Sequence, residues 1–245
     1  PMCEKNSDQA VLTNVLGTRR VADAAVRHKV ALMVQVSTDK AVNPLSVMGA
    51  TKRIAEMYAQ ALGAEGKGTR FVTVRFGNVL NSAGSVVPLF ERQIARGGPV
   101  TVTHPEMTRY FMTIAEAVEL VLQAASLDGG NGASIYVLEM GEPIRIVALA
   151  QQMIRLAGLA PEKDIEIRYT GLRPGEKLHE ALFHPDEAPE ATAHPSIRKA
   201  RARAVAMEVL VGQIEALLSH ARARDAAGVR KQLQRMIPEF EEVKD

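Results

Sequence analysis

Val30-Ala-Leu-Met-Val-Gln-Val36 is a mainly apolar run that is followed directly by the polar stretch Ser37-Thr-Asp-Lys40. A strand buried on both faces of a parallel sheet has this composition. Residues 8–28 and 46–64, on either side, carry apolar side chains at helical spacing, and residues 70–75 are typical of a further strand. This alternation of helix and strand predicts an α/β protein with a doubly wound, Rossmann-like parallel sheet.

Beyond Gly77 the pattern changes to small and polar residues over 78–85, which predicts a binding loop that leads out of the sheet. Thr113 stands three residues before Glu116, the spacing of a helix capping box. The linker-like composition of residues 187–195 predicts a segment that crosses the surface. Other predicted helices are 86–96, 113–126, 144–157 and two in the tail, and other predicted strands are 100–103, 134–138 and 164–169.

These elements predict three regions. Residues 1–80, with 113–141 returning to them, form part of the sheet domain. A smaller α+β region of residues 81–112 and 142–202 binds substrate. Residues 203–245 form a helical tail.

Composition narrows the classes of function. The chain has 245 residues, 47% of them hydrophobic and 24% charged, as in a soluble globular protein. A net charge of +2 gives no reason to expect a nucleic-acid surface. The single Cys3 fits a reducing, cytoplasmic location and excludes a cysteine-rich metal site, and we expect no metal. No apolar run reaches the ~20 residues that span a bilayer.

Residues just after two neighbouring strands carry the candidate chemistry. In a doubly wound sheet, ligands bind outside the carboxyl ends of the strands. Thr38, Asp39 and Lys40 follow one strand and Asn78 follows the next, so they could meet at one substrate. From composition alone, Asp39 and Lys40 also fit an exposed turn with two solvated charges.

The segment from Asn43 to Glu56 resembles the active-site helix of extended short-chain dehydrogenases, whose usual form is tyrosine, three residues, lysine. Here these positions hold Met48 and Lys52. Together with Arg75-Phe-Gly-Asn-Val79, Arg109-Tyr-Phe-Met-Thr113 and Gly171-Leu-Arg-Pro-Gly-Glu-Lys177, the chain resembles the CapD-like nucleotide-sugar 4,6-dehydratases, and most closely the large, membrane-anchored members that carry methionine at this position.

The resemblance implies a reaction that uses catalytic NAD. UDP-N-acetylglucosamine, or a related UDP-N-acetylhexosamine, is oxidised at carbon 4, loses water across carbons 5 and 6, and becomes a UDP-4-keto-6-deoxy sugar for capsule, O-antigen or glycan synthesis. One group must protonate the departing hydroxyl while another removes the carbon 5 proton. We assign Asp39 as the acid and Lys40 as the base, which requires the pKa of Lys40 to lie below its usual value of about 10.4.

Three neighbouring residues complete the expected catalytic group. Thr38 should hydrogen-bond the sugar, although a turn cap is its simpler role. Lys52 should hold the nicotinamide ribose. Met48 can pack against the nicotinamide, but a thioether cannot take a proton from the carbon 4 hydroxyl. That role falls to Asp39, to Thr38 through a relay, or to water.

The remaining site residues are expected to bind the two ligands. Arginine matches phosphate oxygens in a bidentate way, so Arg109 and Arg173 are expected on the diphosphate, with Glu176 on a ribose or orienting Arg173. The expected cofactor contacts are Ser37, Lys52, Phe76, Asn78 and Val79, and the expected substrate contacts are Asn78, Asn81, Ser82, Ser85, Arg109, Arg173 and Glu176.

The G-x-G-x-x-G fingerprint of dinucleotide-binding folds is absent from this sequence. We therefore expect the C-terminal part of a longer enzyme, anchored at the cytoplasmic face of a membrane. An uncovered apolar sheet edge near residues 8–36 would favour association, and helices 8–28 and 46–64 are the expected homodimer face. A nucleotide-sugar 4-epimerase of the same fold and a non-catalytic UDP-sugar-binding module are the alternatives.

Overall fold

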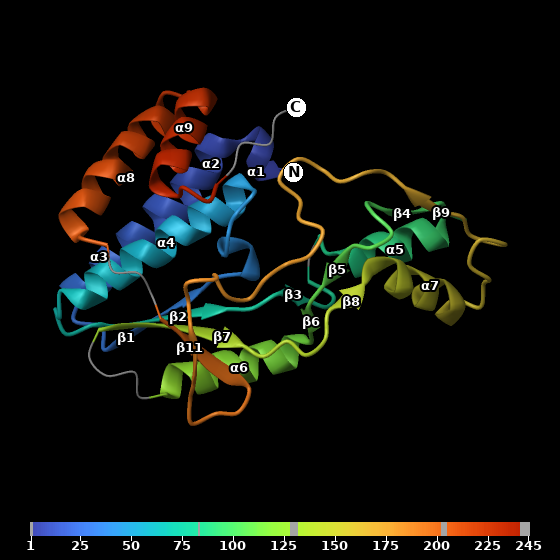
Figure 1. Ribbon diagram of the computed structural model, residues 1–245, viewed down its shortest axis with the longest axis horizontal. Coiled ribbons are helices and arrows are strands. Elements are labelled where there is room, and N and C mark those ends of the chain that lie inside the picture. The colour runs from blue at the N-terminus through green and yellow to red at the C-terminus, as the bar shows by residue number, and fades with distance from the viewer. Residues whose placement is uncertain (1, 83, 128–131, 202–204, 241–245) are drawn as a thin grey trace. The chain divides into compact units, whose positions relative to one another are not determined.

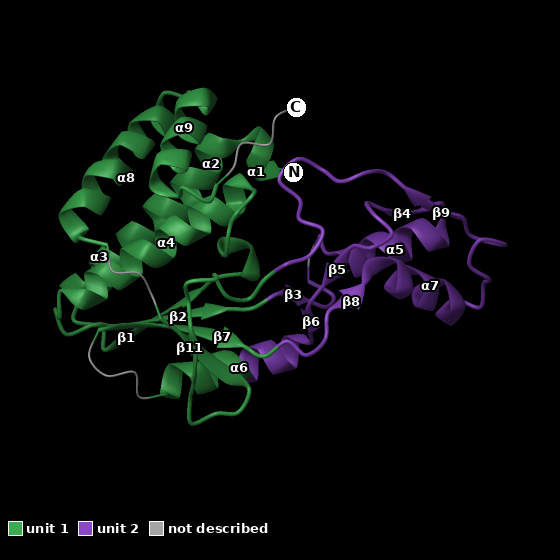
Figure 2. Ribbon diagram, viewed as in Figure 1, with its two compact units in different colours: residues 1–76, 120–139, 181–245 green, residues 77–119, 140–180 purple. Residues whose placement is uncertain are grey.

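The computed structural model describes residues 2–82, 84–127, 132–201 and 205–240. The chain forms two compact units (Figures 1 and 2). Unit 1 comprises residues 1–76, 120–139 and 181–245, and unit 2 comprises residues 77–119 and 140–180.

Unit 1 is built on a five-stranded sheet in the order β1-β2-β7-β11-β10. Its first three strands are parallel, with Leu32 opposite Arg70 and Phe71 opposite Ala133. The last two strands are antiparallel additions. The bounds are β1 (Leu32–Val36), β2 (Arg70–Arg75), β7 (Ala133–Leu138), β10 (Pro189–Ala191) and β11 (Ile197–Ala200). The predicted Rossmann-like parallel sheet is thus confirmed.

Strand β1 differs from the expectation that both of its faces are buried. Gln35, which is 7% exposed, is its only buried residue, and Val36 is 49% exposed. Among the described strands, β1 pairs with β2 alone and ends the sheet. The apolar run of residues 30–36 predicts a central strand. Among the described residues it forms an edge strand instead.

One face of the sheet carries α4 (Val47–Ala64), which packs on β2 and β7, while α6 (Ile114–Ser126) lies on the other side (Figure 1). Ser46 caps α4, because its hydroxyl accepts a hydrogen bond from the Gly49 amide at 3.1 Å. The predicted helix 8–28 is present with a π-helical middle. Its parts, after the short α1 (Met2–Lys5), are α2 (Ser7–Val11), η1 (Leu12–Leu16) and α3 (Gly17–Arg27).

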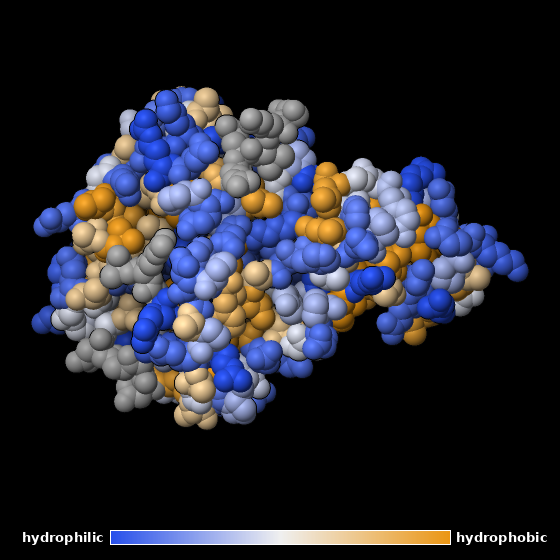
Figure 3. Space-filling model, in the orientation of Figure 1, coloured by the Kyte–Doolittle hydropathy of each residue, from blue (hydrophilic) through white to orange (hydrophobic). Residues whose placement is uncertain are grey.

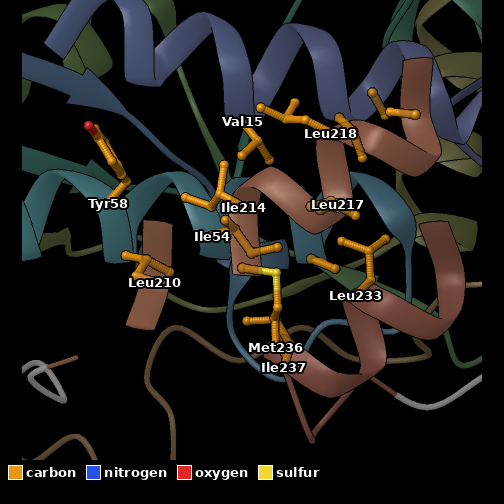
Figure 4. Packing of buried hydrophobic residues seen from close by; sticks show 14 of the residues in the cluster. Val15, Ile54, Tyr58, Leu210, Ile214, Leu217, Leu218, Leu233, Met236 and Ile237 are labelled. Atoms are coloured by element: carbon orange, nitrogen blue, oxygen red, sulfur yellow. The ribbon is translucent and has the colours of Figure 1, made fainter. Parts of the chain in front are cut away.

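The tail forms α8 (Met207–Arg222) and α9 (Ala226–Met236), which pack against α2 and α4. Ile214 and Leu217 of α8 and Leu233 of α9 are fully buried, and their side chains meet those of Val15 and Ile54 (Figure 4). Hydrophilic residues prevail on the outward side of α9 (Figure 3). The tail therefore covers part of the helical surface on which we expect a homodimer.

Unit 2 contains three short strand pairs and its own core. Phe90 and Ile154 pack in that core with Val100 and Ile167. The pairs are β3 (Asn78–Val79) with β6 (Phe111–Met112), β4 (Val100–Val102) with β9 (Ile167–Tyr169), and β5 (Thr108–Arg109) with β8 (Ile144–Arg145), and the helices are α5 (Val86–Ala95), α7 (Ile146–Leu156) and the first part of α6.

The predicted capping box of α6 is confirmed, because the Glu116 amide donates to the Thr113 hydroxyl at 3.2 Å and the Thr113 amide donates to the Glu116 carboxylate at 2.7 Å.

The described residues 181–201 lie in unit 1, where β11 within them pairs with β7.

Within the described ranges, no helix has both the length and the apolar character needed to cross a bilayer.

Candidate functional site

The loop that follows β1 is fixed against the end of β2. Beyond Val36, the Ser37 amide donates to the Val74 carbonyl at 2.8 Å, and the Asp39 amide donates to the Phe76 carbonyl at 3.1 Å. Residues 39–41 then form a 3-10 turn, η2 (Asp39–Ala41), whose cap is the Thr38 hydroxyl. The two chains thus stay side by side past the ends of their strands, and this holds residues 37–40 at the carboxyl edge of the sheet.

The Asp39 carboxylate is the centre of a compact polar group. Its Oδ1 accepts hydrogen bonds from the Thr38 hydroxyl at 2.8 Å and from the Lys40 ammonium at 2.9 Å. The Asp39 side chain is fully buried, whereas that of Lys40 is 26% exposed. Asp39 Oδ2 is buried and has no hydrogen-bond partner among the described residues. Burying a carboxylate oxygen without a hydrogen-bond partner costs free energy. Such oxygens are found at catalytic groups.

These contacts bear on how protons can move. The Thr38 hydroxyl donates directly to Asp39, so the proton relay considered for a site without tyrosine has its first contact in place. Lys40 Nζ lies 2.9 Å from the same Asp39 oxygen, within ion-pair distance.

Lys52 reaches the same edge of the sheet from α4. Its ammonium donates to the carbonyl of Val36, the last residue of β1, at 3.3 Å. Burial lowers the pKa of Lys52, although the charge of Glu56 one turn later opposes this effect. Met48 lies one turn before Lys52 and is half-buried. The helix therefore presents a cation with a lowered pKa where the tyrosine-lysine pair of dehydrogenases is expected.

We expect Lys52 to lose its proton at a lower pH than an ordinary lysine, whose pKa is about 10.4. The sign follows from burial, which favours the neutral amine. Acetylation rates of Lys52, measured by peptide mass spectrometry between pH 7 and 11 against a lysine-containing model peptide, report this pKa. A midpoint for Lys52 at or above that of the peptide would contradict the expected direction.

Behind the loop lies a buried ionic network that the sequence did not indicate. Arg75, fully buried, makes paired contacts with Glu56 and with Glu187, and the Ser37 hydroxyl donates to Glu56 at 2.6 Å. Burial alone would raise the pKa values of both glutamates, but the charge of Arg75 and its hydrogen bonds hold both below their usual range. The Ser37 hydroxyl, an expected cofactor contact, is thus engaged with Glu56.

The segment of residues 187–195 is mainly exposed, as expected of a chain that crosses the surface, but Glu187 at its start is an exception. Its side chain is 4% exposed, and residues 189–191 pair with β11 as β10. The segment is rich in proline, alanine and charged residues, and this composition does not distinguish Glu187 from its neighbours. The partner of Glu187 lies 112 residues earlier in the chain.

Gly49 is a second residue that sequence reasoning missed. A Cβ at this position would lie 2.1 Å from the Lys40 carbonyl oxygen and 3.0 Å from Pro44 Cβ. The first turn of α4 can therefore approach the η2 turn only with glycine at position 49. The glycine sits in the dehydrogenase-like segment, but its spacing gives no sign of this contact.

Gly49→Ala should cost about 1–3 kcal/mol in the free energy of unfolding, as overpacking usually does, because the backbone of Lys40 must move. The matched control is Gly212→Ala in α8, where a Cβ meets nothing within 4 Å and should stabilise the helix by ~0.5–1 kcal/mol. Urea unfolding of both variants measures the difference. Equal midpoints for the two variants would show that the contact is not tight.

Unit 2 holds a separate cavity of about 200 Å³. Five of the expected substrate contacts line it, namely Asn78, Ser85, Arg109, Arg173 and Glu176. The hydroxyl oxygen of Ser85 is buried there and has no hydrogen-bond partner among the described residues. The cavity therefore has both polar and apolar lining residues, and it carries both arginines that the sequence predicted for a diphosphate.

The two arginines of the cavity have different surroundings. Arg109 is buried, and its guanidinium donates to the carbonyls of Lys177 and Leu178 at 2.8 and 3.2 Å, so it holds the loop that contains Arg173. Arg173 is exposed, and its amide donates to the Glu176 carboxylate at 3.1 Å. Arg173 is thus the more accessible cation, and Glu176 shapes its turn.

The other expected residues lie outside these contacts. Asn81 is exposed in the left-handed region at φ 59°, and the Ser82 hydroxyl donates to the Val79 carbonyl at 2.8 Å. Neither lines the cavity. Val79 lies in β3, and Phe76 contributes its carbonyl to the loop of Asp39. The described part of the chain shows no cluster of three or more histidine, cysteine or acidic side chains arranged for a metal.

Known proteins have sequences similar to this one. A family model described as "Polysaccharide biosynthesis protein" matches residues 1–202. The capsular polysaccharide biosynthesis protein CapD of Staphylococcus aureus is 57% identical over 187 residues, which are 76% of this chain and 31% of that protein. The chain therefore spans about a third of the length of that relative.

A curated epimerase and several solved structures are also similar to this chain. A UDP-glucose 4-epimerase of Rickettsia rickettsii is 40% identical over 195 residues, which are 78% of this chain and 54% of the epimerase. The solved structure of Pen from Bacillus thuringiensis superposes with a TM-score of 0.73 at 33% identity, over 86% of this chain and 72% of that one. Other solved structures of the same fold contain NAD.

Proposed function

Because this chain belongs to the polysaccharide biosynthesis protein family, we propose that it carries the catalytic groups of a nucleotide-sugar 4,6-dehydratase that uses NAD. The substrate of the proposal is UDP-N-acetylglucosamine or a related UDP-N-acetylhexosamine. The product is a UDP-4-keto-6-deoxy sugar for a surface polysaccharide.

The observation that carries the proposal is the contact of Asp39 with both Thr38 and Lys40 at the carboxyl end of β1. Elimination of water from carbons 5 and 6 needs one group that gives a proton and one that takes a proton. A carboxylate and an amine in contact can fill these two roles. Epimerisation at carbon 4 needs no such pair.

We assign each residue a role in this reaction. Thr38 binds the hydroxyl on carbon 4 and passes its proton to Asp39. Lys40 takes the proton from carbon 5 and returns it there when the hydride adds to carbon 6, while Asp39 gives the proton received through Thr38 to the hydroxyl that leaves carbon 6. Lys52 binds the nicotinamide ribose, and Met48 packs beside the ring. NAD, when bound, supplies a reversible hydride transfer that starts at carbon 4 and ends at carbon 6.

The fit of NAD to this chain rests on Lys52. Its half-buried ammonium lies at the end of β1, and ammonium groups donate to ribose hydroxyls. In unit 2, the cavity with Arg173 and Asn78 suits the diphosphate and a ribose of the UDP-sugar, since exposed guanidinium groups bind phosphate oxygens.

The similarity to UDP-glucose 4-epimerase at 40% identity favours a second candidate, a UDP-sugar 4-epimerase. Such an enzyme would use the same Lys52 and the same cofactor but leave carbon 6 unchanged. A third candidate, a UDP-sugar-binding module without catalysis, follows from the absent G-x-G-x-x-G fingerprint.

One incubation separates these three functions. The longest protein that the gene encodes is mixed with UDP-N-acetylglucosamine and NAD, and products are analysed by mass spectrometry. A dehydratase gives a product lighter by one water, whereas an epimerase gives an isomer of unchanged mass. Unaltered substrate, together with UDP binding in calorimetry and no NAD binding, would indicate the binding module.

A further inference from the structure

Glu187 is tied to the candidate active site by an unbroken chain of buried contacts. Its Oε2 lies 2.6 Å from Arg75 Nη1, and its Oε1 lies 3.0 Å from Arg75 Nη2. Bidentate pairs of this kind fix the orientation of both groups. Arg75 is the last residue of β2, and its side chain is fully buried.

Arg75 is also connected, through Glu56, to the loop of residues 37–40. Arg75 Nε and Nη2 donate to the two oxygens of Glu56 at 2.8 and 2.7 Å, and Glu56 Oε1 accepts from the Ser37 hydroxyl at 2.6 Å. Arg53 contacts both carboxylates, at 3.1 Å for Glu56 and 3.3 Å for Glu187. Two guanidinium groups thus face two carboxylates, and the four charges cancel.

Each element that supplies a catalytic residue has a member in this network. Ser37 directly precedes Thr38 and Asp39 in the loop. Glu56 lies one turn after Lys52 on α4, and Arg75 precedes Phe76, whose carbonyl holds the Asp39 amide. Glu187 is the member that comes from outside these elements, and it supplies half of the negative charge.

We propose that Glu187 is a positioning residue for the candidate active site, because its carboxylate holds Arg75 and thereby the Glu56 and Ser37 contacts that fix residues 37–40 and Lys52. The catalytic consequence rests on the proposed function, but the positioning does not. Without the Glu187 charge, the network carries one uncompensated buried cation, which weakens the hold of Arg75 on the loop.

The test is Glu187→Gln in the 245-residue chain, with Glu190→Gln as the matched control. Glu190 lies three residues later in the same segment, is exposed and pairs only loosely with Arg201 at 3.3 Å. Backbone hydrogen exchange is read at the Ser37 and Asp39 amides and, for comparison, in β7. We expect exchange at the two loop amides to rise by about tenfold or more in Glu187→Gln, with β7 unchanged.

Lys52 provides a second reading that a purely structural role would not change. With Glu187 neutral, the network gains a net positive charge, so Lys52 should lose its proton at a lower pH than in the wild type. Glu190→Gln should leave both readings unchanged. If Glu187→Gln does not fold, Glu187→Asp tests the hydrogen-exchange reading alone, because it shortens the reach to Arg75 but keeps the charge.

Two outcomes overturn the proposal. Either the loop amides exchange as in the wild type, or all amides, including those of β7, accelerate by the same factor, which indicates global destabilisation alone. In the longest encoded protein, Glu187→Gln should lower kcat with little change in KM. If wild-type protein forms no dehydrated product while the exchange result holds, the assigned reaction fails and the positioning role stands.

Discussion

Asp39→Asn should lower kcat for dehydration by about 10²- to 10⁴-fold, which is the usual contribution of a general acid or base. The asparagine keeps the shape of the side chain, so Thr38 and Lys40 can still contact its carbonyl oxygen, yet the amide can neither accept the relayed proton nor return it. KM should change little, because the buried side chain is not expected to supply most of the binding. Steady-state kinetics of product formation measure both constants.

The control for this variant is Asp164→Asn, which changes an exposed aspartate of unit 2 in the same way. It should retain wild-type kcat. Thermal unfolding of Asp39→Asn separates lost catalysis from lost structure. A folded Asp39→Asn enzyme with wild-type kcat would rule Asp39 out as the acid.

Arg75→Gln should destabilise unit 1 by about 3–5 kcal/mol, the usual cost of removing one partner from a buried ion pair. Glu56 and Glu187 would then lie buried with Arg53 as their remaining guanidinium partner. Urea unfolding of the 245-residue chain at neutral pH measures the loss. The matched control is Arg198→Gln, an exposed arginine on β11 of the same sheet, which should change stability by less than about 0.5 kcal/mol.

The effect of Arg75→Gln should depend on pH with a definite sign. In the wild type, Arg75 holds the pKa values of Glu56 and Glu187 below their usual range, so the stability they provide is present above the unfolded pKa and is lost as pH falls through the folded pKa. In the variant, burial dominates and raises both pKa values. The difference in stability between variant and wild type should therefore shrink from pH 8 to pH 5. A constant or growing difference would show that the two carboxylates are not the cause.

The architecture was largely predictable, because it depends on local patterns. The apolar run before Ser37, the helical spacing of residues 46–64 and the capping box at Thr113 all report directly on nearby backbone. Partners distant in sequence were not predictable in this way. The pairing of β11 with β7 and the packing of the tail on α2 and α4 depend on residues far apart in the chain. No periodic pattern in the sequence indicates these contacts.

The candidate site likewise contains contacts between sequence neighbours, which were predictable, and contacts between distant residues, which were not. Thr38, Asp39 and Lys40 are neighbours in the sequence, so their contacts follow from one short turn. The roles of Gly49 and Glu187 depend on what approaches them in space. A glycine beside a carbonyl and a glutamate beside a buried arginine look like ordinary residues in the sequence. Two of the expected contacts, Asn81 and Ser82, do not line the cavity that contains Asn78 and Ser85.

The most direct test of the central claim follows one hydrogen atom. The longest encoded protein is incubated with NAD and UDP-N-acetylglucosamine that carries deuterium on carbon 4, and the product is examined by mass spectrometry and NMR. The proposed dehydration predicts a keto sugar that has lost its carbon 6 oxygen and carries the deuterium on carbon 6. A product that keeps the carbon 6 oxygen and carries the deuterium on carbon 4 would contradict it.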